Sequence, residues 1–362
     1  MQQKRTVEVN GQKFYFMDDS ASKHVRSETY NYDFDKISGA FRRWGKDEDD
    51  DPQFSPLGPE ILDIEVCTNG CEHFCEFCYK GNTNSAPTNM TLDGFKTILD
   101  MINPSLTQIA FGITGVQTNP YLLGMMQYCR DLGVVPNVTL TGFDMTRNIA
   151  HMITQLAGAI SVSVYQTDKE LGYNTIRELS LRKAFINMQL LISQETLPFV
   201  YEVLEDKTKY PRLAYLHSVI FLGVKPKGRD RDSFKPVSGE QYSNLMRYCN
   251  EHEIPYGFDS CSAPQFEESL DRLGMDPRLK ILSESCESTL FSLYINVNGD
   301  CYGCSFCEGE FKAAPLNVFR YKNFLRDIWY SSQFEEFRGD LLKTIKNGCR
   351  HCPVFDLEGV SK

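Results

Sequence analysis

The side chains in this chain that are best suited to chemistry are cysteines, and most of them gather in two groups. One group lies in the stretch CTNGCEHFCEFCYKG and comprises Cys67, Cys71, Cys75 and Cys78. The other follows much later and comprises Cys286, Cys301, Cys304, Cys307, Cys349 and Cys352. Clustered thiolates select zinc, Cu(I) or iron–sulfur clusters, because soft ligands prefer such metals. Two groups at opposite ends of the chain therefore predict two metal centres.

Disulfides are a poor explanation for 13 cysteines in this chain. The N-terminal stretch MQQKRTVEVNGQKFYF lacks the apolar segment of a secretory signal, and no long apolar run predicts a membrane span. We therefore expect a cytoplasmic protein without a membrane partner, in a compartment that keeps thiols reduced. The net charge of −10 argues against nucleic acid as a partner, because phosphate binding requires a basic surface.

The first group has an uneven spacing that distinguishes two kinds of metal site. Three residues separate Cys71 from Cys75 and two separate Cys75 from Cys78, with no second pair of ligands nearby. Zinc sites usually close a tetrahedron with two pairs of ligands far apart in the sequence. Three thiolates on one tight loop suit a [4Fe–4S] cube whose fourth iron stays free. The alternative is a closed zinc site with Cys67 as the fourth ligand.

From residue 60 onward, short apolar runs alternate with helical stretches. The runs predict six strands, at 60–66, 106–113, 134–142, 159–165, 184–192 and 217–224, and one more at 255–261. Alternating strands and helices indicate a parallel sheet, here curled into a partial (βα)6 TIM-like barrel of the α/β class. Active sites of such barrels gather at the carboxyl ends of the strands. The first cysteine group directly follows the first strand, so it lies at that face.

Both ends of the chain depart from this alternation. Residues 1–58 look irregular apart from a small hairpin that turns at Asn10-Gly11, and the acidic run at 46–51 reads as an exposed linker. From about residue 280 the chain becomes rich in cysteine, with a hairpin turning at Asn298-Gly299. We predict an N-terminal extension over 1–58, the partial barrel over 59–262 and a small cysteine-rich auxiliary domain over 263–362.

The stretch GCEHFCEFCYKG resembles the signature of the radical S-adenosylmethionine (SAM) superfamily, CxxxC-x-aromatic-C, after the first barrel strand. The resemblance implies that Cys71, Cys75 and Cys78 hold a [4Fe–4S] cluster whose open iron binds the amino and carboxylate groups of SAM. Phe77 would lie beside the adenine. It also implies reductive cleavage of SAM to a 5′-deoxyadenosyl radical that abstracts hydrogen from substrate, with an electron donor such as flavodoxin or ferredoxin.

The motif that usually contacts the amino group of SAM departs from the family pattern here. A Gly-Gly-Glu-like motif follows strand two in the family, whereas this chain has ITGVQTNP at 113–120, without a glutamate. The resemblance leaves Thr114, Gly115 or Gln117 to take over that contact.

Further expected contacts to SAM lie on later strands. Ser161 and Ser163 resemble the polar position that contacts the ribose, and ordinary strand alternation explains them equally well. Gln189 on the fifth strand would face the carboxylate side. The stretch KPKGR at 225–229 resembles a turn whose backbone approaches adenine, with a solvated basic loop as the alternative.

The second group resembles the SPASM and twitch auxiliary domains of this superfamily. The similar features are Cys286-x12-Gly299-x4-Cys304 and the pair Cys349-x2-Cys352. The resemblance implies one auxiliary [4Fe–4S] cluster of the twitch type, held by these four cysteines. Other assignments remain open: Cys301 or Cys307 competes as a ligand, and a zinc ribbon using Cys301 is the alternative on spacing alone.

Cys261 ends the last expected strand, where a thiol facing the cavity would donate a hydrogen atom to a substrate radical. A buried apolar cysteine is the simpler interpretation. The auxiliary domain is associated with modification of peptides or proteins, which makes such a substrate the first expectation. A small-molecule dehydrogenase or isomerase, acting on a sugar, cyclitol or nucleoside, is the second. A zinc-binding structural or interaction module is the alternative outside the enzymes.

Overall fold

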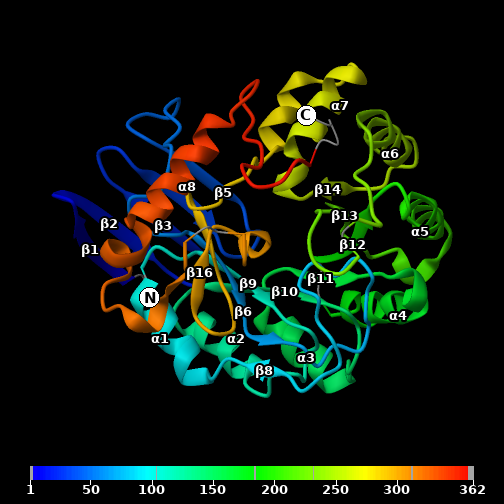
Figure 1. Cartoon of the computed structure of the whole chain (residues 1–362), viewed down its shortest axis with the longest axis horizontal. Coiled ribbons are helices and arrows are strands. Elements are labelled where there is room, and N and C mark those ends of the chain that lie inside the picture. Colours follow the sequence, from blue (N-terminus) through cyan, green and yellow to red (C-terminus); the bar gives the residue numbers. More distant parts are fainter. Residues whose placement is uncertain (1–2, 103, 183–184, 231, 311–312, 358–362) are drawn as a thin grey trace.

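A computed structural model of the chain describes residues 3–102, 104–182, 185–230, 232–310 and 313–357. Its centre is a ten-stranded sheet with the order β14-β13-β12-β11-β10-β9-β6-β15-β16-β17 (Figure 1). The barrel strands are β6 (Ile61–Glu65), β9 (Gln108–Gly112), β10 (Val135–Leu140), β11 (Ile160–Ser163), β12 (Ile186–Ile192), β13 (Ser218–Gly223) and β14 (Tyr256–Phe258). Neighbours from β6 to β14 all run parallel. The predicted α/β class and parallel sheet are confirmed, and the open strand order is consistent with a partial barrel.

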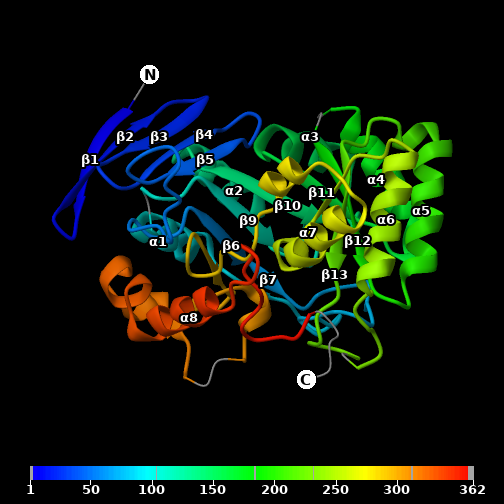
Figure 2. The same cartoon turned by 90° about the horizontal axis from the view of Figure 1, so that it is seen from above.

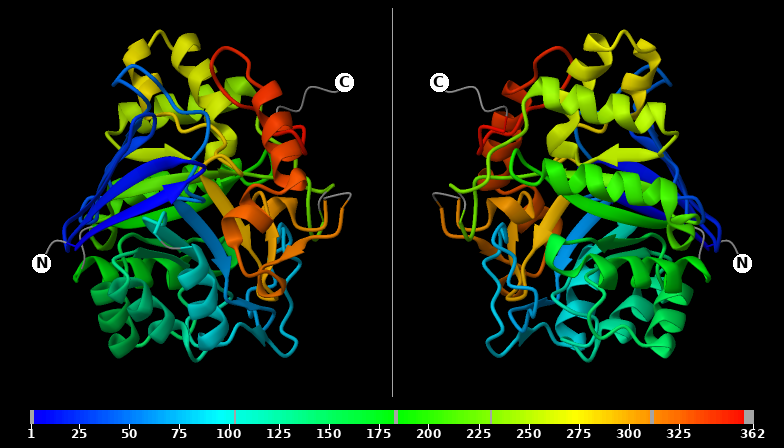
Figure 3. Two further views of the ribbon diagram at one scale, coloured as in Figure 1. Left: turned by 90° about the vertical axis from the view of Figure 1, so that its left-hand side faces the viewer. Right: turned by 90° about the vertical axis from the view of Figure 1, so that its right-hand side faces the viewer.

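Helices cover the outer face of the parallel strands, as Figure 1 and the right-hand view of Figure 3 show. They are α1 (Leu92–Ile102), α2 (Leu122–Asp131), α3 (Arg147–Leu156), α4 (Lys169–Ser180), α5 (Leu197–Lys209), α6 (Gly239–Glu251) and α7 (Ala263–Arg272). The spacing of apolar residues explains their placement: α1 buries Phe95, Ile98 and Leu99 on one face. The start of α6 is set by a capping box between Ser238 and Gln241.

Residues 3–44 are regular, which corrects the expectation that 1–58 is mostly irregular. They form a five-stranded antiparallel sheet of β1 (Gln3–Val9), β2 (Gln12–Asp18), β3 (Ser22–Arg26), β4 (Asn31–Asp35) and β5 (Phe41–Trp44). The predicted hairpin between β1 and β2 is confirmed, and Asn10 and Gly11 have φ values of 50° and 80°, as a tight turn of this kind requires. The acidic run at 46–51 is exposed, as expected.

A buried ion-pair network fastens this N-terminal sheet to the rest of the molecule. The Arg43 guanidinium donates to Glu60, with Nε 3.1 Å from Oε2, and its Nη1 lies 3.3 Å from the Glu287 carboxylate. It also stacks 3.4 Å from the centroid of the Phe291 ring. Because Glu60 precedes β6 and Phe291 precedes β15, one side chain joins three parts of the chain.

The C-terminal part continues the barrel sheet. β15 (Ser292–Ile295) pairs in parallel with β6 and in antiparallel with β16 (Asp300–Tyr302), and β17 (Leu316–Asn317) follows at the edge. The predicted hairpin turns at Asn298-Gly299, where Gly299 has a φ of 86°. α8 (Ser332–Lys343) follows a π-helical turn at Leu325–Trp329. Figure 2 shows α8 on the flank that also carries the N-terminal sheet, and the two share one apolar cluster.

A short antiparallel pair, β7 (Cys67–Thr68) and β8 (Thr88–Asn89), brackets the first cysteine group. The loop that carries these cysteines therefore begins and ends close to the carboxyl end of β6. Within the described parts of the chain, we find no helix with the length and apolar character that crossing a membrane demands.

Candidate active site

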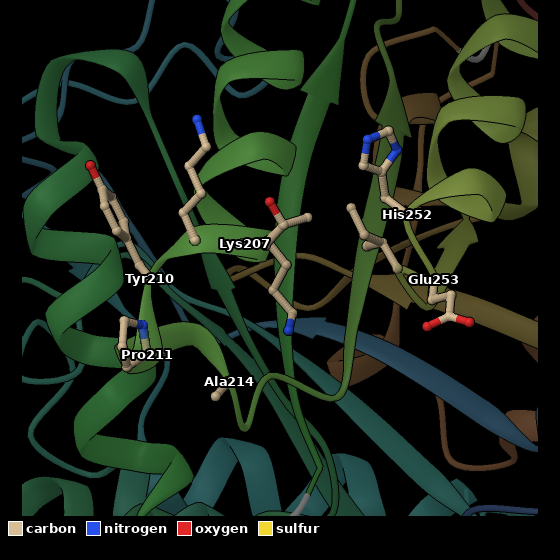
Figure 4. Close-up of a pocket in the computed structure, with 9 residues that line it drawn as sticks. Lys207, Tyr210, Pro211, Ala214, His252 and Glu253 are labelled. Carbon is tan, nitrogen blue, oxygen red and sulfur yellow. The ribbon is translucent and has the colours of Figure 1, made fainter.

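The parallel strands end in a cavity of about 630 Å³. Its wall combines the cysteine loop, the carboxyl ends of β6 and β9 to β13, and residues of the C-terminal part such as Tyr294 and Phe306. A second hollow lies between the ends of α5 and α6, near Lys207, Tyr210 and His252 (Figure 4). That hollow is at the amino ends of the strands and has no cysteine in its wall. The first cavity is therefore the candidate active site.

Three thiols face this cavity from one loop: those of Cys71, Cys75 and Cys78. Burial, and then the charges of Cys71 and Cys78, raise the pKa of the Cys75 thiol to about 12. Thiolates that repel one another in this way are stabilised by a cationic cluster, so the donor set fits a [4Fe–4S] centre. Among the described residues, no three His, Cys, Asp or Glu side chains gather closely enough for one metal ion. A cube holds each thiolate on a different iron and therefore spaces its ligands more widely.

Cys67 is placed differently from these three. Its side chain is buried at the end of β6, and the Thr114 backbone N–H donates to its Sγ over 3.4 Å. The Thr114 hydroxyl lies 3.6 Å from the same sulfur. Cys67 thus packs beneath the loop, at the end of β6.

The loop after β13 holds the cysteine loop in position. Arg229 Nη1 donates to the Cys75 carbonyl over 2.8 Å, and the Arg229 N–H donates to the Cys78 carbonyl over 3.1 Å. The guanidinium also stacks 3.7 Å from the centroid of the Phe74 ring. A Cβ on Gly228 would lie 2.2 Å from the Cys78 carbonyl oxygen. The stretch 225–229 is therefore packed against the loop, and the alternative of a solvated basic loop is wrong.

Aromatic side chains cover the side of the cysteine loop that faces β11. Phe77 lies 5.8 Å from Tyr165 and 5.7 Å from Phe234, measured between ring centroids. His73 packs 4.3 Å from Phe143 and 4.8 Å from Tyr165. Its Nδ1 is 3.6 Å from the Asp168 carboxylate, yet burial dominates and lowers its pKa. Phe77, the residue expected beside adenine, thus lines the cavity within an aromatic group.

The residues expected to contact SAM divide into two sets. Thr114, Ser163 and Gln189 line the cavity. The other three, Gly115, Gln117 and Ser161, are not in its wall.

Local structure explains this division. Gln117 is exposed and donates to the Asp144 carbonyl over 3.2 Å. Ser161 shares the inward face of β11 with Ser163 but lies two residues nearer the start of the strand. Thr114 faces the cavity, although its hydroxyl already donates to the Asn69 carbonyl over 2.8 Å.

Charged residues in the cavity wall were missed in the sequence. Lys80 lies 3.0 Å from the Glu65 carboxylate, and Lys225 pairs with Asp259. Asp63 also lines the cavity. Part of the signal was present in the strand ILDIEV, where Asp63 and Glu65 alternate with buried Leu62 and Ile64. The partners could not be read from the sequence, because they come from distant parts of the chain.

The second cysteine group separates into two environments. Cys304 Sγ lies 3.3 Å from Cys307 Sγ. The charge of Cys304 contributes to the raised pKa of both Cys286 and Cys352, so these thiols also lie near it. Cys301 instead packs in the apolar core of the barrel, on the other side of the hairpin. The zinc ribbon that required Cys301 beside Cys304 therefore has no support in this arrangement.

The two remaining predicted cysteines differ in their surroundings, since the charges of Cys286 and Cys304 act on Cys261, whereas Cys349 is influenced by Glu267, Ser285 and Arg350. Cys349 is buried, and burial raises the pKa of its thiol to about 11. Cys261 sits in a 3-10 turn after β14 and lines a small neighbouring pocket with Lys225, outside the main cavity wall. Burial raises the pKa of the Cys261 thiol, and the charges of Cys286 and Cys304 add to the effect.

Comparison with known proteins places these features in context. Residues 286–353 match the SPASM family, described as an iron–sulfur cluster-binding domain. No curated protein sequence matches the chain.

Solved structures are similar to most of the chain. SuiB of Streptococcus suis bound to the precursor peptide SuiA matches 89% of this chain and 90% of its own, with a TM-score of 0.64 and 11% identity. The structure of SuiB bound to S-adenosylmethionine is similar over 78% of this chain, with a TM-score of 0.56 and 13% identity. The similarity covers 66% of the SuiB chain, slightly less than two thirds of its length. The protein anSMEcpe with bound AdoMet and the Cp18Cys peptide matches 84% and 92%, with a TM-score of 0.58 and 12% identity. At such identities the likeness concerns the fold. The chain thus shares the fold of these structures, and residues 286–353, within the cysteine-rich part expected to resemble a SPASM or twitch domain, match the SPASM iron–sulfur cluster-binding domain.

Proposed function

We propose that this protein is a radical SAM enzyme that modifies a peptide or protein. The observation that carries the proposal is the loop that directs Cys71, Cys75 and Cys78 into one cavity at the carboxyl ends of parallel strands. Three protein ligands leave a position of the cluster free, which is the mark of a catalytic rather than a structural centre. When bound there, the cluster and SAM supply a 5′-deoxyadenosyl radical for abstraction of a substrate hydrogen.

The chain's own residues position these groups and exclude water. Phe77 and Tyr165 form an apolar wall suited to a flat base. Ser163 and Gln189 present a hydroxyl and an amide to the same space, suited to hydrogen bonds with a ribose or carboxylate. Arg229 fixes the loop by bonding to the carbonyl of Cys75. In this proposal the ligands of the auxiliary cluster are Cys286, Cys304, Cys349 and Cys352.

Similarity of fold supports a peptide as the substrate. Two of the similar structures contain a peptide: SuiB with its precursor SuiA, and anSMEcpe with Cp18Cys. The first of these similarities extends over 89% of the present chain, so it includes the barrel and the C-terminal part together. A likeness of fold does not fix a reaction, and the outcome of hydrogen abstraction is left open in the proposal.

The volume of the cavity favours one further candidate. Small-molecule sites in proteins typically occupy about 300–1,000 Å³, and this cavity has about 630 Å³ for SAM and substrate together. The cluster, SAM and the substrate have to share this volume, which favours a small reacting group. A dehydrogenase or isomerase of a sugar, cyclitol or nucleoside is therefore the second candidate.

Deuterium transfer distinguishes the two candidates. The reconstituted, reduced enzyme is incubated with SAM and with deuterated peptides, or with deuterated sugars, cyclitols and nucleosides, and 5′-deoxyadenosine is analysed by mass spectrometry. The proposal predicts deuterium in 5′-deoxyadenosine from peptides. Transfer from a small molecule, with none from any peptide, would establish the second candidate instead.

A further inference from the structure

Asp63 lies in the wall of the main cavity, and it has no hydrogen-bond or ion-pair partner among the residues that the structure describes. It is on β6, between Ala110 of β9 and Tyr294 of β15 in the strand register, and its side chain borders the cavity.

The other charged groups of the wall are paired. Glu65, the next inward residue on the same strand, lies 3.0 Å from Lys80 Nζ, and Lys80 also pairs with Glu308. On the opposite side, Lys225 pairs with Asp259. The described cations of the wall are therefore already committed to other carboxylates, so Asp63 cannot recruit one without breaking a pair.

An unpaired carboxylate is costly in these surroundings. Removing it from water disfavours its charged form, and burial accordingly raises the pKa of Asp63 to about 6. It therefore remains mainly ionised at neutral pH, at a cost to the folded protein. No hydrogen bond or ion pair from the described part of the chain offsets that cost, which is the pattern found where a side chain serves a ligand.

Asp63 shares the cavity wall with the cysteine loop, and its charge reaches Tyr79, the residue after Cys78. It precedes Cys67 by four residues along an extended strand, which corresponds to roughly 13 Å. The amino and carboxylate groups of SAM belong at the open iron in the proposed function, so Asp63 remains available to another ligand group in the same cavity. Among the described residues of the wall, such a group meets a free carboxylate and no free cation.

We infer that Asp63 binds a positively charged group of the substrate, an ammonium or a guanidinium. A carboxylate only accepts hydrogen bonds, and a cationic donor both satisfies its oxygens and neutralises its charge. This inference rests on the proposed function, since the substrate must react in this cavity. It narrows the substrate class to a peptide segment with lysine, arginine or a free amino terminus, or to an amino-substituted small molecule.

The test compares matched ligands in two series. One series is a peptide scaffold with lysine, arginine, norleucine or glutamate at one position, and the other pairs an aminocyclitol with the cyclitol that has a hydroxyl in its place. Dissociation constants are measured by equilibrium dialysis with the SAM-loaded holoenzyme, together with deuterium transfer to 5′-deoxyadenosine. We expect the wild type to bind the cationic member roughly tenfold more tightly or better, in whichever series reacts.

Variants assign the preference to one side chain. Asp63→Asn should reduce the ratio of the dissociation constants of the neutral and cationic members to about one. The affinities for SAM and for the neutral member should stay unchanged within about twofold. Asp63→Glu should retain part of the preference, and Asp51→Asn, in the exposed acidic run, should have no effect. An equal preference in Asp63→Asn and wild type, or a loss of SAM binding instead, overturns the inference. The reacting series decides separately between the peptide and the small molecule, so the two proposals fail independently.

Discussion

Replacing Asp63 by asparagine should stabilise the protein, and the gain should depend on pH. Asp63 has a pKa of about 6 in the folded protein because burial disfavours its charged form, against an ordinary value of 3.8. A carboxyl whose pKa is higher when folded binds more protons in the folded state, so stability falls as the pH rises between the two pKa values. Asparagine has a similar shape and no charge, so it removes this penalty.

The size of the effect follows from the two pKa values. Above pH 7 their difference corresponds to about 3 kcal/mol of unfolding free energy. At pH 5 the folded carboxyl is largely protonated, and the penalty falls to about 1.5 kcal/mol by the same relation. We therefore expect Asp63→Asn to raise the free energy of unfolding at pH 8, and by about half as much at pH 5.

Urea unfolding of the reconstituted protein at the two pH values, followed by circular dichroism, measures both gains. Asp51→Asn is the matched control, because it removes a carboxylate from the exposed acidic run and should change stability by less than about 0.5 kcal/mol. No gain at pH 8, or the same gain at both pH values, would refute the reasoning that the cavity leaves this carboxylate uncompensated. A stabilised variant that binds cationic substrates poorly would fit the usual conflict between stability and function.

Two further changes test the framework around the site. Gly228→Ala should displace the cysteine loop, since its Cβ would meet the Cys78 carbonyl at 2.2 Å; iron analysis should show loss of the first cluster. Gly309→Ala is its control, because Gly309 has a similar φ of 78° and no atom within 4 Å; an equal iron loss there would contradict the steric argument. Arg43→Ala should cost about 3–5 kcal/mol in urea unfolding, since it leaves buried Glu60 unpaired, whereas Arg42→Ala, in an exposed pair, should cost at most about 1 kcal/mol. Similar costs for the two arginines would show that the buried network does not fasten the N-terminal sheet.

The barrel and its cysteine loop could be predicted because their signals are local. Each strand of the barrel is a short apolar run, and Cys71, Cys75 and Cys78 carry their spacing within one stretch of sequence. The N-terminal sheet was missed for the opposite reason. Its strands mix charged and aromatic residues, and the alternation of Phe14 and Phe16 with exposed neighbours becomes clear only once the partner strands are known.

The charged part of the site could not be predicted, because it depends on pairs that are distant in the sequence. Lys80 meets Glu308 across 228 positions, and Lys225 meets Asp259 across 34 positions. Strand alternation placed Ser161 and Ser163 on the same face of β11. It could not show how far along the strand the cavity extends, and only Ser163 of the two lines it. The unpaired state of Asp63 likewise emerged only after the partners of its neighbours were known.

Anaerobic reconstitution with iron and sulfide shows whether the first cysteine group holds an open iron–sulfur centre for SAM. We expect a brown protein with about eight irons per chain, the content of two [4Fe–4S] cubes, that cleaves SAM when reduced. Alanine at Cys71, Cys75 or Cys78 should abolish that cleavage, and alanine at Cys67 should leave it largely intact. A colourless protein that binds zinc, or a Cys67→Ala variant as inactive as the other three, would contradict the account.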